Sequence, residues 1–350
     1  MNDEQSPPIL STIPRYVPPP RTGPLTYPAP QAATGIPTSN LVLFFLTLWT
    51  TSAAGALMAG ANHPFLNPFS LAKGLTFSIP LMAILLSHEM GHYITARRNG
   101  VATSWPFFLP APFPSIFIIG TFGAFIRMKS AAQTRRVMFD IGAAGPWAGA
   151  VLSVIAVIIG LHRSEVLPLD QSGGLQLGNS LLFLGLARWM LGVDPNSVTI
   201  NLDPVAFAGW IGLFVTTLNL LPSGQLDGGH VIYALFGRLH YFISRACTFA
   251  CIVLAVVPAL FGWSFWPGWL LWAGLLYFLG LRHPSALDPE TPLDPRRQAA
   301  ALLTIALFVV TFSPIPFSFA PPPSSPPTRG QSYNVLQPAA RARVPLDHRI

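Results

Sequence analysis

Apolar residues recur along the chain in runs that are long enough to cross a lipid bilayer, which takes roughly 17–25 residues. One shorter apolar run, residues 181–193, is not long enough to cross alone and carries Arg188, so we expect it to lie at the membrane interface or against the other helices. The long runs predict an all-α polytopic membrane protein with about 6–8 transmembrane helices. They cover residues 41–61, 75–96, 139–161, 205–221, 246–262, 267–281 and 299–317.

One apolar stretch, residues 105–128, does not fit a helix. It contains Pro106, Pro110, Pro112 and Pro114 and then the sequence Gly-Thr-Phe-Gly at 120–123. Proline removes backbone donors and breaks helices, whereas the β-branched residues here favour extended backbone. We therefore expect a re-entrant segment resembling a β-hairpin. Such backbone is tolerated at membrane depth only where protein buries it or where it lines a wet cavity.

Composition agrees with a lipid environment. The chain is 51% hydrophobic and only 9% charged, whereas soluble proteins average about 25% charged residues. The formal charge is +7, but the cations lie in short clusters between apolar runs, so no nucleic-acid partner is predicted. The two cysteines, Cys247 and Cys251, are four residues apart and are interpreted as small buried hydrophobes.

Basic residues also predict the orientation. Arg97 and Arg98 follow the second long run, and another basic cluster follows the hairpin segment at residues 127–136. The positive-inside rule places this side in the cytoplasm. We expect four parts in the chain. They are a disordered Pro-rich tail at 1–38, a core at 39–283, a linker with an additional transmembrane helix at 284–320, and a disordered Pro-rich tail at 321–350.

The second long run contains the candidate chemistry. His88 and His92 are four residues apart, so on a helix they share one face and can bind one zinc ion, while Glu89 can act as general base. Ionisable groups inside a membrane span are costly and indicate function. Catalytic zinc usually has three protein ligands, and the best third candidate is Asp227, although Asp203 and Asp140 also flank apolar runs.

Two motifs, one at residues 88–92 and one at residues 219–228, carry a family resemblance. With them the sequence resembles the site-2 protease family of intramembrane zinc metallopeptidases, in the bacterial and chloroplast-like branch without a PDZ domain. The family pattern H-E-x-x-H matches residues 88–92. The distant pattern of Asn, Pro and Asp-Gly matches Asn219, Pro222, Asp227 and Gly228. The resemblance covers residues 41–282. It implies one Zn²⁺ per chain on His88, His92 and Asp227, and hydrolysis of a transmembrane segment of a protein substrate.

The resemblance also suggests how a substrate is held. A transmembrane helix must unwind before it is cut, and a strand edge around residues 117–125 could pair with the freed backbone. Gly120, Thr121, Phe122 and Gly123 are therefore candidate substrate-binding residues, and Asn219 is a candidate for the substrate backbone or the oxyanion. His230 is either a spare ligand or, more often for such a residue, an interfacial one.

Two other functions stay open at this point: a membrane metal transporter, and an inactive scaffold that binds transmembrane segments. Transport would need polar groups along a path across the bilayer, and Glu89 argues against an inactive scaffold. The expected partners are the lipid bilayer and a transmembrane substrate, and the sequence does not predict the oligomeric state. Without a transit peptide, we expect the bacterial inner membrane, with the active site nearer its cytoplasmic side.

Overall fold

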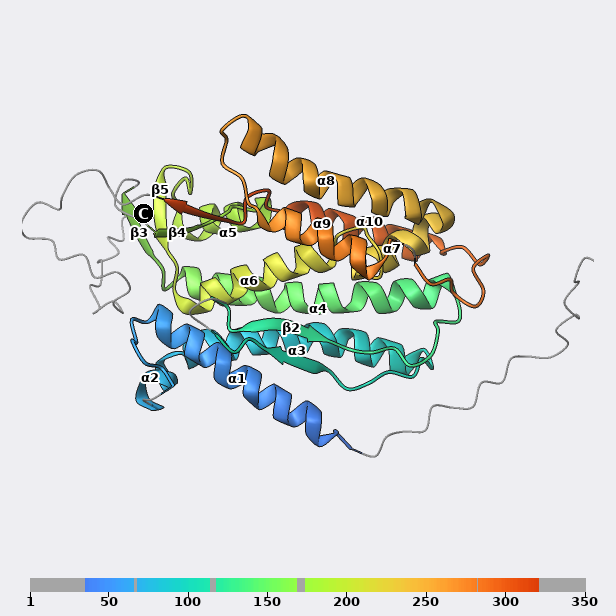
Figure 1. Cartoon of the computed structure of the whole chain (residues 1–350), viewed down its shortest axis with the longest axis horizontal. Coiled ribbons are helices and arrows are strands. Elements are labelled where there is room, and N and C mark those ends of the chain that lie inside the picture. The colour runs from blue at the N-terminus through green and yellow to red at the C-terminus, as the bar shows by residue number, and fades with distance from the viewer. Residues whose placement is uncertain (1–34, 66–67, 114–117, 169–173, 282, 321–350) are drawn as a thin grey trace, which may run out of the picture. The chain divides into compact units, whose positions relative to one another are not determined.

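The computed structural model describes residues 35–320 apart from 66–67, 114–117, 169–173 and 282 (Figure 1). Most of the N-terminal tail expected from the sequence and all of the C-terminal tail lie outside the described residues. So does residue 117, the start of the predicted strand edge.

Helices dominate the described part of the chain, and they begin and end close to the long apolar runs. Gly237–Leu239 forms one turn of 3₁₀ helix. The α-helices are α1 (Thr38–Met58), α2 (Pro68–Lys73), α3 (Leu75–Arg98), α4 (Arg135–Leu161), α5 (Leu181–Leu191), α6 (Pro204–Asn219), α7 (Asp227–Phe236), α8 (His240–Leu260), α9 (Gly268–Leu279) and α10 (Pro295–Thr311).

Short strands form antiparallel pairs. β1 (Phe107–Pro110) and β2 (Thr121–Phe125) form the hairpin within the proline-rich stretch, with Phe107 opposite Phe125. β3 (Glu165–Pro168) pairs with β5 (Val198–Asn201). β4 (Gly174–Leu177) pairs with β6 (Phe317–Ala320), which follows α10. The last two pairs were not predicted, because strands this short give little periodic signal.

The central helix is α4, which packs against α3, α6 and α7 (Figure 1). The interior between these helices is apolar, and it includes the fully buried side chains of Leu81, Val157 and Ile211. On one side α1 lies against α3 and β1, and on the other α8 and α9 pack together. The α3–α4–α6 layer therefore forms the frame that carries the polar residues described below.

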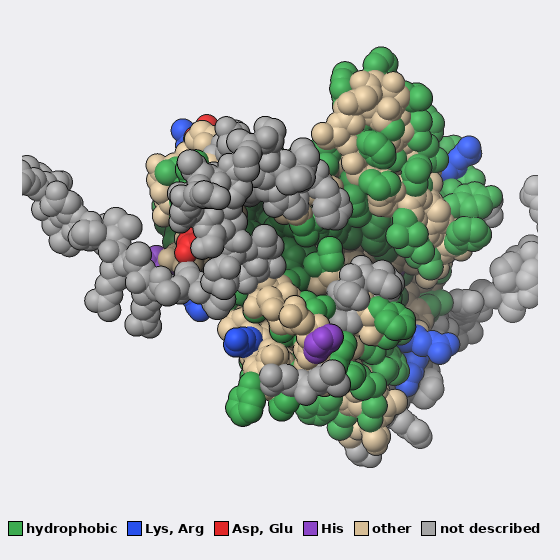
Figure 2. All heavy atoms as spheres, turned by 60° about the vertical axis from the view of Figure 1, so that its left-hand side comes forward, with side chains coloured by type: hydrophobic (Ala, Val, Ile, Leu, Met, Phe, Trp, Pro, Cys, Tyr) green, Lys and Arg blue, Asp and Glu red, His purple; other side chains and the backbone are tan. Residues whose placement is uncertain are grey.

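The surface is suited to lipid. Three helical stretches are long and apolar enough to cross a membrane, namely Thr38–Met58, Arg135–Leu161 and Asp227–Leu260, while α5, α6 and α9 are apolar but shorter. Many large hydrophobic side chains are exposed, as on the face in Figure 2, where green side chains far outnumber charged ones. On α8 and α9, Phe249, Leu271 and Phe278 are 67%, 65% and 86% exposed. Water-soluble monomers rarely show apolar surface of this extent. The chain is an integral membrane protein.

The last helix is tied to the others by polar contacts. The guanidinium of Arg297 on α10 binds both carboxylate oxygens of Asp140 on α4, at 2.8 and 2.7 Å. Farther along, the indole N–H of Trp147 donates to the hydroxyl of Thr304 at 3.0 Å. Asp140, considered above as a possible metal ligand, is therefore engaged in an ion pair between helices.

Candidate metal centre

The two histidines of the H-E-x-x-H motif lie on one face of α3 and are buried among helices. His88 is 4% exposed, Glu89 5% and His92 6%. The Nδ1 atom of His92 lies 2.7 Å from the backbone carbonyl oxygen of Ile141 on α4. Since a carbonyl can only accept, Nδ1 carries a proton, and Nε2 is the nitrogen that faces the other two side chains and is placed to bind a metal ion. This is the usual way in which a second partner orients a metal-binding histidine.

A glycine on α4 makes room for this ring. A Cβ atom on Gly145 would lie 2.0 Å from Nε2 of His92, so any larger residue there would displace the imidazole. The absence of a side chain at Gly145 therefore lets α3 and α4 approach each other with the imidazole of His92 between them.

Asp227 reaches the same place from the distant motif. After Asn219, the last residue of α6, the chain makes a short turn, and Asp227 is the first residue of α7. Gly228 allows the turn to fold back on α6, since a Cβ atom there would lie 2.0 Å from the backbone oxygen of Leu220. The sequence did not predict α7 as a separate helix, because it has only 10 residues and begins with Asp-Gly-Gly.

Three side chains converge at this point. Oδ2 of Asp227 lies 3.1 Å from Nε2 of His88 and 3.2 Å from Nε2 of His92, and the two Nε2 atoms are 3.1 Å apart. Ligands about 2.0–2.1 Å from a tetrahedral zinc ion lie roughly 3.3 Å from one another. The donor set of two imidazoles and one carboxylate, at this spacing, therefore fits a single zinc ion. Among the described residues, no other group of histidine, cysteine and acidic side chains meets in this way.

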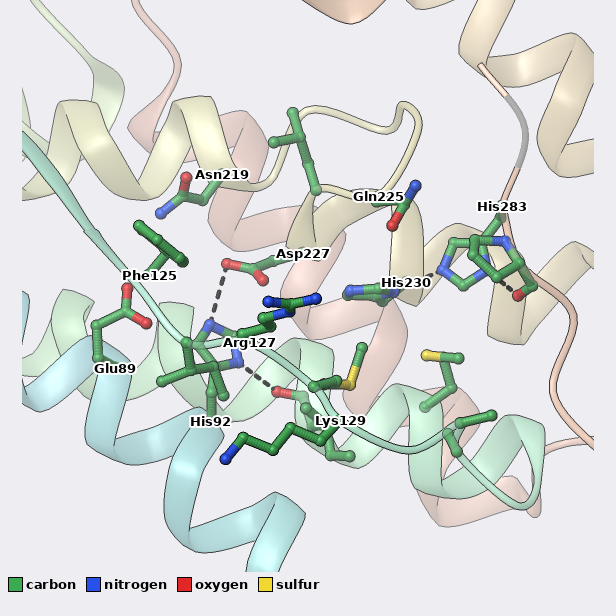
Figure 3. A pocket seen from close by; sticks show the side chains of 18 of the residues that line it. Glu89, His92, Phe125, Arg127, Lys129, Asn219, Gln225, Asp227, His230 and His283 are labelled. Atoms are coloured by element: carbon green, nitrogen blue, oxygen red, sulfur yellow. Dashed lines mark hydrogen bonds and ion pairs between the residues drawn. The ribbon is translucent and has the colours of Figure 1, made fainter. Parts of the chain in front are cut away.

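Glu89 lies beside the cluster and interacts with the backbone of Ile126, just beyond β2. Glu89 and Ile126 both border a cavity of about 600 Å³, shown in Figure 3. One wall is the chain from Ala124 to Ala132, and the opposite wall includes Asn219 and the start of α7. Water and an extended peptide therefore have space next to the three converging side chains.

The other predicted residues are placed as follows. The Nδ2 atom of Asn219 lies 3.2 Å from Nε2 of His88, at the edge of the cluster. Gly120, Thr121, Phe122 and Gly123 do not line the cavity, whose hairpin wall begins only at Ala124. Asp203 caps α6 by accepting from the N–H of Val205, so it lies outside the cluster.

His230 lines the cavity one turn after Asp227, but it is bonded to another histidine. Its Nδ1 lies 2.5 Å from Nε2 of His283, whose Nδ1 lies 2.6 Å from the carbonyl oxygen of Pro284. Protons on both Nδ1 atoms satisfy this chain of hydrogen bonds. Burial lowers the pKa of His283, in the loop before α10, to about 3, so its ring is neutral at pH 7.

Sequence reasoning missed several residues of the cavity. Arg127 and Lys129 were used only to orient the chain, and Gln225 and His283 were not considered, yet all of them line the cavity. The basic pair directly follows the predicted hairpin, and that position was the one available signal. Nothing in the local sequence of His283 indicates its position beside α7.

Known proteins that are similar to this chain include probable zinc metalloproteases. The probable zinc metalloprotease EGY1, chloroplastic, of Oryza sativa subsp. japonica is 37% identical over 196 residues, which are 54% of this chain and 33% of the relative. The probable zinc metalloprotease EGY2, chloroplastic, of Arabidopsis thaliana is 31% identical over 265 residues, which are 74% of this chain and 44% of the relative. No solved structure matches the chain.

The chain therefore spans less than half the length of these relatives. Their names describe chloroplast proteins, which gives no support to the expected bacterial inner membrane. The sequence profile of peptidase family M50 matches residues 76–260, a range that contains both motifs of the cluster. This chain belongs to peptidase family M50.

Proposed function

We propose that the chain is an intramembrane zinc metalloprotease that cuts transmembrane segments of other membrane proteins. The observation that carries this proposal is the convergence of His88, His92 and Asp227, 3.1–3.2 Å apart, beside a buried glutamate. Zinc with three protein ligands keeps a position for water, as hydrolysis requires.

The roles of the residues follow from their positions. His88, His92 and Asp227 would hold one zinc ion, which when bound lowers the pKa of water and polarises a carbonyl group. Glu89 is the general base: it takes the proton of the attacking water and passes it to the leaving amine. Asn219, with its amide beside His88, donates a hydrogen bond to the substrate carbonyl oxygen as negative charge develops there.

The hairpin holds the unwound substrate. Within the described residues β2 pairs only with β1, and beyond β2 the chain runs along the cavity past Glu89. An extended substrate paired with residues 124–128 would have its scissile bond near Ile126. This shifts the binding segment by a few residues from Gly120–Gly123, which instead shape the start of β2. The hairpin is re-entrant in this proposal.

The membrane setting follows from helix lengths and charge. α3 contains 24 residues, or about 36 Å of helix, so it can span although its site residues make it less apolar. With α3, α6 and α10, of 24, 16 and 17 residues, added to the three longer stretches, six spans are reached. The 12-residue α9 is shorter than a span and packs against α8. Arg97 and Arg98 end α3 on the side to which the positive-inside rule assigns the cytoplasm or its equivalent, and the site lies nearer that end.

The decisive experiment is the Glu89→Gln variant in lipid vesicles with a transmembrane reporter. Zinc per chain should stay at the wild-type value while cleavage falls by at least ~10²-fold, the usual scale for loss of a general base. A transporter would instead move zinc across the vesicle membrane without cleaving the reporter. Wild-type cleavage by Glu89→Gln would contradict the proposal.

A further inference from the structure

Two cations line the cavity close to the metal cluster. Arg127 and Lys129 lie two and four residues beyond the end of β2, and both border the same cavity as Glu89 and Asp227. Figure 3 shows their side chains among the residues that surround it. Within the described part of the chain, neither side chain forms an ion pair, and the carboxylates of the other ion pairs belong to Asp140, Asp203, Asp227 and Asp294.

The backbone holds these two residues in place while their side chains stay available. The N–H of Arg127 donates to the hydroxyl of Ser104 at 2.9 Å, and its carbonyl accepts from the N–H of Ser104 at 2.9 Å. The N–H of Lys129 donates to the carbonyl of Ala102 at 2.7 Å. Both side chains are exposed. They are thus two positive groups, two residues apart, on a segment that backbone hydrogen bonds hold beside the cavity.

The acidic groups of the cavity do not neutralise the charges of Arg127 and Lys129. Glu89 and Asp227 are the acidic side chains among the lining residues, and both belong to the proposed catalytic site. A bound zinc ion would make the positive excess larger. An extended peptide in this cavity would meet an environment that favours a carboxylate.

We propose that Arg127 and Lys129 form a cationic subsite that binds an acidic side chain, Asp or Glu, of the substrate. This proposal rests on the proposed function, which it deepens by naming a substrate class. The acidic residue lies on the flank of the scissile bond toward the basic side of the membrane. Since strands rise about 3.3 Å per residue, it lies within about three residues of a scissile bond near Ile126.

Membrane topology alone does not explain why Arg127 and Lys129 line the cavity. Arg98, at the end of α3, also contributes to the positive side, yet it does not line the cavity. A lipid phosphate could also bind two cations, but these two share their cavity with the proposed catalytic residues, where the substrate chain passes. We therefore assign the pair to the substrate.

The experiment uses the full chain in vesicles with a transmembrane reporter. Asp, Gln or Lys is placed at each of four successive positions on the flank toward the basic side. The enzymes are wild type, Arg127→Gln, Lys129→Gln, the charge reversal Arg127→Glu and, as matched control, Arg98→Gln. Measured quantities are kcat/KM, cleavage position and zinc per chain.

In wild type, Asp at one of these positions should raise kcat/KM on the order of tenfold over Gln, the effect of one hydrogen bond to a charged group. Arg127→Gln and Lys129→Gln should each reduce that ratio. Arg127→Glu should prefer the Lys reporter, and Arg98→Gln should keep the wild-type ratio. Zinc content should be the same in all variants, which separates the effect from folding.

Three outcomes would overturn the subsite. One is equal kcat/KM for the Asp, Gln and Lys reporters in wild type. Another is loss of the preference in Arg98→Gln as much as in Arg127→Gln, which would indicate a general surface charge. The third is dependence on the anionic lipid content of the vesicles without dependence on the reporter residue, which would assign the cations to lipid. If wild type cuts no more reporter than Glu89→Gln does, the proposed function itself fails.

Discussion

Gly145 on α4 faces the imidazole of His92 on α3 so closely that a Cβ atom at this glycine would lie 2.0 Å from Nε2. Nε2 is the atom that points to Asp227, 3.2 Å away. The position of one proposed metal ligand therefore depends on a residue that offers no side chain at all.

Gly145→Ala should weaken zinc binding by about 10- to 100-fold, the range found when groups that orient metal ligands are changed. Zinc affinity measured by competition with a chelator checks this. Gly274→Ala on α9 is the matched control, because nothing lies within 4 Å of a Cβ atom there. Equal zinc affinity in both variants would show that the ring of His92 can shift without consequence.

Asp227→Ala should leave zinc substoichiometric in the purified protein, since two histidines remain of three ligands. Metal analysis per chain gives the answer. Asp203→Ala removes a carboxylate that caps α6 and should keep full zinc. If Asp227→Ala retains one zinc ion per chain and full activity, another side chain supplies the third ligand.

Ile126 tests the role of the hairpin wall. Ile126→Pro removes the backbone donor beside Glu89, whereas Ile126→Ala keeps it. Proline should abolish cleavage of a transmembrane substrate and alanine should reduce it only modestly, with zinc per chain unchanged in both. A short soluble peptide, already extended, should be affected less by the proline. Equal losses on both substrates would contradict strand pairing and would assign the effect to the lost contact between Ile126 and Glu89.

Arg297 should stabilise the contact between α4 and α10. Arg297→Ala removes both hydrogen bonds to Asp140, and because the pair is partly exposed we expect a loss of about 1 kcal/mol in the free energy of unfolding. Arg297→Lys should restore little, since lysine cannot bind both oxygens in the same plane. Thermal unfolding in detergent measures the change. The neighbouring Arg296→Ala, whose side chain is exposed, serves as control.

Much of this arrangement could be predicted from sequence because it depends on local spacing. The i, i+4 positions of His88 and His92 place both on one face of a helix wherever that helix lies. Asp227 was chosen differently, because it follows an apolar run and precedes two glycines, and the resemblance to a known motif pointed to the same residue. The proline-rich stretch indicated a hairpin, and β1 and β2 form one.

The rest depends on contacts between distant segments. That the cavity wall begins at Ala124 rather than at Gly120 follows from how β2 lies against α1 and α3. The position of His283 beside His230 requires α8 and α9 to return the chain to α7. The pairing of β4 with β6 joins segments on either side of several helices. No periodicity within one segment contains this information.

The separation of His88 and Asp227 along the chain, 139 residues, has a consequence for biosynthesis. At about 5–20 residues per second, a ribosome needs roughly 7 to 28 s to proceed from the first to the second. During that interval the nascent chain has the proposed general base and two histidines but lacks the carboxylate that completes the proposed zinc site. Under the proposed function, the chain is therefore inert while it is being inserted next to other unfinished membrane proteins, and it gains activity only after α7 has joined α3.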